Sequence, residues 1–169
     1  MNRLFYQIAL TMISSVGPIT AKHLISYCGS PEAVFKESKK NLLKIPGLGP
    51  KTILVIKESN CFPQAEKELD FIHRNNIQTA YFLDADYPKR LKVYDDAPIL
   101  LYFKGKNVLN ATRNIAIIGT RKPTEYGKEM VQQLVSDLAP YEITMVSGLA
   151  YGIDICAHKA ALHLSLIHI

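Results

Sequence analysis

Two short glycine-containing segments hold the residues of this sequence that are best suited to bind a phosphate. Gly119–Arg121 directly follows the apolar run 115–118, and Ser147–Gly148 closes the apolar run that begins at residue 143. Glycine lets a phosphate approach the backbone, hydroxyl groups donate hydrogen bonds, and the planar guanidinium of arginine suits a phosphate. A generic strand-to-helix turn is the alternative, but two such loops with one arginine favour an anion site. The predicted site comprises Gly119, Thr120, Arg121, Ser147 and Gly148.

A second candidate lies in a turn between two expected helices of the N-terminal half. The segment 45–52 places Gly47 and Gly49 in the turn and Lys51 at the start of the next helix, and a shorter turn of the same kind occupies 16–20. Such a turn resembles the helix-hairpin-helix motif, in which free N–H groups at a helix start hold a phosphate without reading sequence. A plain turn in a protein-interaction domain is the alternative. Gly47, Gly49 and Lys51 are therefore secondary candidates for DNA contact.

The sequence signatures of several enzyme classes are missing. The dinucleotide fingerprint is absent, because Arg121 stands where that motif has its second glycine, and there is no Walker lysine, GxSxG elbow or metal-ligand set. Asp154 and His158 share one helix face, but we expect Asp154 to cap the helix start and His158 to pack beside the loop. Tyr126 and Tyr151 are expected to pack in the core rather than to stack on a base. The sequence predicts no catalytic residue, no metal and no cofactor.

The secondary structure expected to position these residues changes near residue 79 from helices alone to strands and helices. Residues 1–78 are expected to form short helices, with Ser30-Pro31 in the form of a helix start. Later runs predict strands at 79–83, 99–103, 115–118 and 143–147, and helices at 124–139 and 153–162. A strand–helix–strand order at this spacing is typical of a right-handed βαβ unit, whose loops meet at the carboxyl edge of a parallel sheet.

Composition and charge narrow the partners and the compartment. The chain has 169 residues, 48% of them hydrophobic and 21% charged, and three cysteines that form neither a metal-binding pair nor an even disulfide set. No run is long enough to span a membrane and no signal peptide is evident, so the sequence predicts a cytoplasmic protein without a membrane partner. The net charge is +5, with ten basic against six acidic residues in 1–78. This excess favours a polyanion partner, although many proteins of this charge bind none.

A longer set of motifs carries a resemblance to a known family. Four segments closely resemble motifs of the bacterial DNA-processing family DprA/Smf: Ile117–Arg121, Tyr126-Gly127, Val146–Asp154 and Ala157–Leu162. The segment 87–105 resembles the same family. The resemblance covers nearly all of 1–163. It implies an α/β fold, in which a helical SAM-like/helix-hairpin-helix domain (1–78) precedes an incomplete, Rossmann-like parallel sheet (79–169).

The resemblance also implies a function. Members of the family bind single-stranded DNA, protect incoming DNA and help load the RecA recombinase during natural transformation and recombination, and they form homodimers. Their DNA-binding pocket corresponds here to Gly119, Thr120 and Arg121 with the loop at Ser147 and Gly148. The chain is therefore expected to be a binding protein and not an enzyme.

Two alternatives and one departure accompany this interpretation. A nucleotide-binding, Rossmann-like enzyme of the phosphoribohydrolase type would need a PGGxGT-type loop, which 1–169 lacks, and a pure protein-interaction module is the other alternative. The tail Leu164–Ile169 does not match the family at this point, so the sequence predicts a C-terminally truncated member whose dimer surface is missing.

Overall fold

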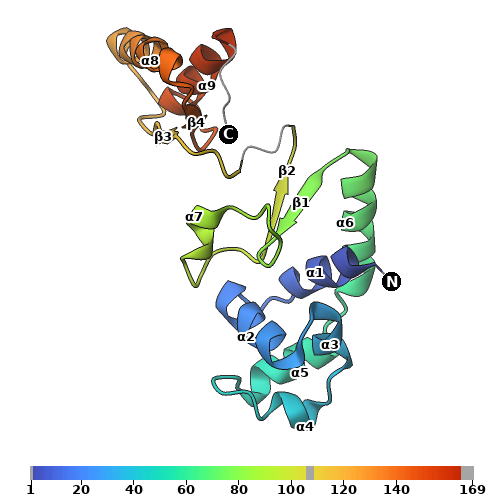
Figure 1. Ribbon diagram of the computed structural model, residues 1–169. Coiled ribbons are helices and arrows are strands. Elements are labelled where there is room, and N and C mark those ends of the chain that lie inside the picture. The colour runs from blue at the N-terminus through green and yellow to red at the C-terminus, as the bar shows by residue number, and fades with distance from the viewer. Residues whose placement is uncertain (1, 106–108, 165–169) are drawn as a thin grey trace. The chain divides into compact units, whose positions relative to one another are not determined.

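The computed structural model describes residues 2–105 and 109–164 (Figure 1). The chain forms two compact units, Met1–Asn107 and Val108–Ile169. The tail discussed above lies outside the described residues from position 165 onward.

Short helices build most of the first unit, as the sequence predicts. Ser30 accepts a hydrogen bond from the Ala33 amide, and Pro31 stands first in its helix, so the predicted helix start is confirmed. Two other helices begin with glycine at the N-cap and proline next, at Gly17 and Gly49. The helices are α1 (Arg3–Thr11), α2 (Pro18–Cys28), α3 (Pro31–Lys36), α4 (Lys39–Leu42), α5 (Pro50–Glu58) and α6 (Phe62–Arg74).

An antiparallel strand pair completes the first unit. β1 (Gln78–Tyr81) pairs with β2 (Leu100–Phe103), with the helix α7 (Lys89–Lys92) in the connection between them. Side chains of this ribbon share the buried core of helices α1–α6, which places the ribbon in the first unit. The predicted strands are thus confirmed. The predicted boundary after residue 78 marks a change in sequence pattern, whereas the packing of the chain changes between 107 and 108 because the ribbon buries its apolar face against helices.

Burial changes the pKa of Tyr81 in this ribbon. Its side chain is 2% exposed, the Arg3 guanidinium lies 5.2 Å from its ring centre, and its hydroxyl has no hydrogen-bond partner among the described residues. Burial raises the pKa of Tyr81 from 10 to about 12. In the unfolded chain a tyrosine ionises near pH 10, before Tyr81 does in the folded chain. The free energy of unfolding is therefore unaffected by this residue below pH 10 and falls as the pH rises from 10 toward 12.

Tyr81→Phe is expected to leave stability at pH 7 unchanged or to raise it by about 1 kcal/mol, because it removes a buried hydroxyl without a partner. The substitution should also make the free energy of unfolding fall less between pH 10 and 12. Burial raises the pKa of Tyr102 to about 12 as well, so Tyr102 accounts for part of the pH dependence that the variant keeps. Urea denaturation at pH 7, 9 and 11 measures both effects. The exposed Tyr27→Phe is the control, and equal pH slopes for the two variants would contradict the prediction.

The second unit is a strand–helix–strand–helix sequence. β3 (Asn114–Ala116) pairs in parallel with β4 (Thr144–Val146), with Asn114 opposite Thr144 and Ala116 opposite Val146. The helix α8 (Glu125–Leu138) and the 3-10 turn η1 (Ala139–Tyr141) connect the strands, and α9 (Ile153–His163) follows β4. The parallel pair and both helices are as predicted, with shorter strands. The predicted fold class, a helical domain followed by an incomplete parallel sheet, is confirmed.

Helices α8 and α9 pack against each other and against the strands. The core contains Val131 and Val135 of α8, Met145 of β4, and the small Ala157 and Ala161 of α9. Leu134 of α8 is 46% exposed. The core therefore lies between α8, α9 and one face of the strands.

Candidate functional site

The predicted loops meet at the carboxyl edge of β3 and β4. The Ile117 amide continues the strand pairing to the Val146 carbonyl at 3.0 Å, and the Ser147 hydroxyl donates to the Ile117 carbonyl at 2.7 Å. The Ile153 amide donates to the Thr120 carbonyl at 3.1 Å. The structure thus brings the Gly119–Arg121 segment and the Ser147–Gly148 segment together, as parallel pairing predicts.

Two glycines allow the loop backbones to touch. A Cβ on Gly119 would lie 2.7–2.8 Å from three side-chain atoms of Ile153. Gly152 has φ +92, and a Cβ there would lie 2.2 Å from the Thr120 carbonyl oxygen and 2.7 Å from the Arg121 Cα. Only glycine combines this φ with so close an approach. The start of α9 is therefore held directly against the Thr120-Arg121 backbone.

The first loop keeps its anion-binding groups available. Among the described residues, no intrachain hydrogen bond engages the amides of Gly119, Thr120 or Arg121, and the guanidinium of Arg121 is exposed without an ion pair. The Thr120 hydroxyl accepts from the Lys122 amide at 3.2 Å, which leaves its proton free to donate. Amides, hydroxyl and guanidinium together suit a phosphate oxygen.

The second loop uses its donors internally. The Gly148 amide donates to the carboxylate of Asp154 at 3.1 Å, and the Ser147 hydroxyl is already donated to Ile117. Asp154 is buried in the first turn of α9, but the N-cap is Gly152, so the expectation that Asp154 caps this helix is wrong. His158 is buried, as expected. The capacity to bind an anion therefore lies on the first loop, with the second loop as its support.

Two tyrosines beside the loops are exposed rather than packed. Tyr126 in the first turn of α8 is 70% exposed, and Tyr151 before α9 is 82% exposed, which contradicts the expectation that both pack in the core. The intervening Leu149 is also 70% exposed and adopts the left-handed region at φ +56. Sequence analysis missed Gly152 and Leu149. A glycine just before a predicted helix was the one available signal for Gly152.

The glycine turn of the first unit places the secondary candidates together. Gly47 has φ +78, Gly49 is the N-cap of α5, and Lys51 is exposed in the first turn of that helix. The hairpin also carries exposed lysines at Lys39, Lys40 and Lys44, none of which has an ion pair among the residues that the structure describes. The segment from Lys39 to Lys51 is therefore rich in exposed cations.

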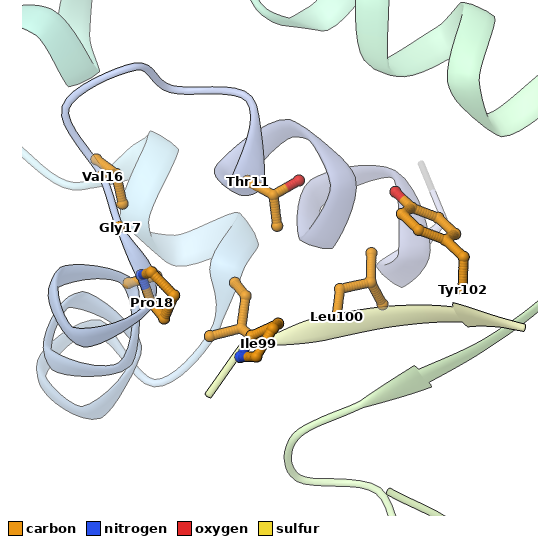
Figure 2. Close-up of a pocket in the computed structure, with 9 residues that line it drawn as sticks. Thr11, Val16, Gly17, Pro18, Ile99, Leu100 and Tyr102 are labelled. Carbon is orange, nitrogen blue, oxygen red and sulfur yellow. The ribbon is translucent and has the colours of Figure 1, made fainter. Parts of the chain in front are cut away.

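A cavity of about 220 Å³ lies beside the other hairpin turn (Figure 2). Thr11 of α1, the turn before α2 and strand β2 contribute to its wall, and the Thr11 hydroxyl is donated to the Ile8 carbonyl at 2.7 Å. No charged side chain lines it, so the cavity suits an apolar group and not a phosphate. Its lining is Thr11, Val16, Gly17, Pro18, Ala21, Pro98, Ile99, Leu100 and Tyr102.

Residues 2–105 and 109–164 contain no cluster of three or more histidine, cysteine or acidic side chains placed to hold a metal ion. Within the same residues, every helix is too short or too polar to cross a membrane.

Two family models and several known proteins are similar to this chain. Residues 78–169 match the model of the family DNA recombination-mediator protein A, and residues 8–59 match the SAM-like helix-hairpin-helix tandem. Protein Smf of Synechocystis is 28% identical over 95% of this chain, and DNA processing protein DprA of Bacillus subtilis is 36% identical over 60%. The chain spans 41% and 34% of those two relatives, respectively.

A solved structure shares the fold. The crystal structure of DNA processing protein A from Streptococcus pneumoniae matches with a TM-score of 0.71 at 24% identity, covering 99% of this chain and 56% of that chain. This likeness supports the assignment of a helical domain followed by part of a Rossmann-like domain.

Proposed function

Since the chain belongs to the DNA recombination-mediator protein A (DprA/Smf) family, whose model matches more than half of it, we propose that it binds single-stranded DNA through the turn Gly119–Arg121. One observation carries this proposal. The turn presents unengaged amides and an exposed guanidinium at the carboxyl edge of a parallel strand pair, inside the matched region. Such groups grip phosphates of any sequence.

The roles of the two loops follow from their hydrogen bonds. Arg121 and the amides of its turn contact phosphate oxygens, and the Thr120 hydroxyl adds one donor. Ser147 and Gly148 belong to the same site, where they fix the turn through Ile117 and Asp154 rather than donate to DNA.

The basic hairpin of the first unit provides a second contact. The start of α5 at Gly49 has no side-chain cap, so the first amides of the helix lack a side-chain partner, and Lys51 is exposed in the same turn. We propose Gly47, Gly49 and Lys51 as residues that hold a further phosphate of the same DNA chain.

The wider role follows the family. The proposal includes protection of incoming DNA in the cytoplasm, delivery of DNA to RecA, and a homodimer in the longer relatives. It assigns binding and not catalysis. The alternative of a phosphoribohydrolase-type enzyme has no support in the reported matches, which include DNA processing protein DprA of Bacillus subtilis.

A salt series with fluorescent oligo-dT tests the proposal. Arg121→Ala is expected to weaken binding about tenfold. Because one phosphate contact is lost, the magnitude of the negative slope of log affinity against log salt should also fall by about 1. The matched control is Arg74→Ala, which removes an exposed arginine of α6 that pairs with Asp70. An unchanged slope in Arg121→Ala, or an equal loss in Arg74→Ala, would overturn the assignment of the turn.

A further inference from the structure

Tyr151 is an exposed aromatic ring beside the proposed phosphate site. It immediately precedes Gly152, whose backbone lies against Thr120 and Arg121 so closely that a Cβ would be 2.7 Å from the Arg121 Cα. The Tyr151 ring, 82% exposed, and the Arg121 guanidinium therefore extend from two backbone segments in direct contact.

The backbone that carries Tyr151 is fixed on both sides. The Gly148 amide is bonded to the Asp154 carboxylate, the Ile153 amide to the Thr120 carbonyl, and the Ile155 amide to the Ala150 carbonyl. Between them, Leu149 is held in the left-handed region at φ +56, a conformation that is costly for a non-glycine residue. The backbone of Tyr151 is therefore held in place, although its side chain is mostly exposed.

We propose that Tyr151 stacks on an unpaired nucleobase whose phosphate is held by the Gly119–Arg121 turn, with the exposed Leu149 side chain against the edge of that base. The inference rests on the proposed function and adds the feature that the phosphate contacts lack. Phosphates occur on single strands and duplexes alike, whereas a free base face exists only on an unpaired strand. Tyr151 therefore supplies the preference for single-stranded DNA.

The charges around the ring favour this occupant. Arg121 and Lys122 are exposed on the adjoining loop, and Asp154 in the first turn of α9 is buried and accepts a hydrogen bond from the Gly148 amide. An exposed aromatic ring on a segment whose backbone contacts a loop with exposed cations suits a ligand that is both aromatic and anionic, which a nucleotide is. An apolar protein segment would use the ring but not the cations.

The experiment compares an oligo-dT with an oligomer of the same length whose sugars carry no bases. Both ligands have the same phosphates, so the ratio of their affinities measures the contribution of the bases. The wild-type chain is expected to prefer oligo-dT, and Tyr151→Ala to lose about fivefold to thirtyfold on oligo-dT but little on the abasic oligomer. Tyr141→Ala is the matched control, because this tyrosine is 58% exposed and lies ahead of β4, at the opposite edge of the strands.

A second measurement reports stacking directly. The sequence contains no tryptophan, so Tyr151→Trp introduces a single indole. Oligo-dT should quench its fluorescence and bind with undiminished affinity, while the abasic oligomer should leave the emission nearly unchanged.

The outcomes separate the two proposals. Equal affinities of the wild-type chain for both oligomers, or an unchanged ratio in Tyr151→Ala, would overturn base stacking and leave the phosphate site standing. Binding of neither oligomer by the wild-type chain would overturn the proposed function and this inference with it.

Discussion

Gly152→Ala is expected to lower the free energy of unfolding of the second unit by about 3 kcal/mol or more. Two penalties combine at this position. The residue has φ +92, which a side chain disfavours, and its new Cβ would lie 2.2 Å from the Thr120 carbonyl oxygen. The obstacle is backbone, so no rotation of a side chain relieves it, and the loops at the ends of β3 and β4 must separate. Urea denaturation, with hydrogen exchange of the α8 and α9 amides to locate the loss, measures the effect.

Gly29→Ala is the control that separates the two penalties. Gly29 ends α2 with φ +90, but a Cβ there would meet nothing within 4 Å. Its cost should therefore be that of the left-handed conformation alone, about 1 kcal/mol. Similar losses in Gly29→Ala and Gly152→Ala would mean that the contact between Gly152 and Thr120 contributes nothing.

Gly119→Ala is expected to cost about 2–3 kcal/mol through the clash alone. The backbone of Gly119 needs no left-handed conformation, but a Cβ would lie 2.7–2.8 Å from the Cβ, Cγ1 and Cγ2 atoms of Ile153. These atoms are at the branch point of a stiff side chain and not at its flexible end. The helix α9 must therefore shift away from the first loop, and thermal or urea denaturation should report the loss.

A double-mutant cycle with Ile153→Ala identifies the source of that cost. Ile153→Ala by itself should destabilise the unit, because Ile153 belongs to the core of the second unit. In its background, however, Gly119→Ala should cost less than in the wild-type chain, since the Cγ1 and Cγ2 atoms are gone and only the Cβ of residue 153 remains, 2.8 Å from the new methyl group. Additive losses would contradict the proposed contact.

Local signals in the sequence sufficed for much of the fold. The Ser30-Pro31 helix start, the helix at Phe62–Arg74 and the strand–helix–strand order after residue 114 each depend on neighbouring residues or on a single periodicity. Because the carboxyl ends of parallel strands meet at one edge, the approach of Gly119–Arg121 to Ser147–Gly148 followed from the same pattern.

Other features depended on contacts between distant residues. The sequence shows that Ser147 and Gly148 have donors, but only the structure shows that Ile117 and Asp154 already accept from them. Tyr151 was expected in the core because aromatic residues are commonly buried, whereas the approach of Gly152 to Thr120 leaves the ring outside.

The domain boundary after residue 78 stays a prediction, because the family match also begins at residue 78 whereas the compact unit that contains the β1–β2 ribbon extends to Asn107. Strand periodicity indicates that a segment is extended, but not which core its apolar face will join. Tyr81 and Leu100 joined the helices of the first unit, and only their packing could show this.

The hydrogen bonds that tie the two loops together also bear on how fast a ligand is captured. The Ser147–Ile117 and Ile153–Thr120 bonds are made between the protein's own groups, so the backbone of the turn needs no ordering by a ligand. Little conformational entropy would be lost in the encounter. Association would then be governed by diffusion and by the attraction of Arg121 for the phosphate, and changes in affinity among DNA sequences would appear in the dissociation rate.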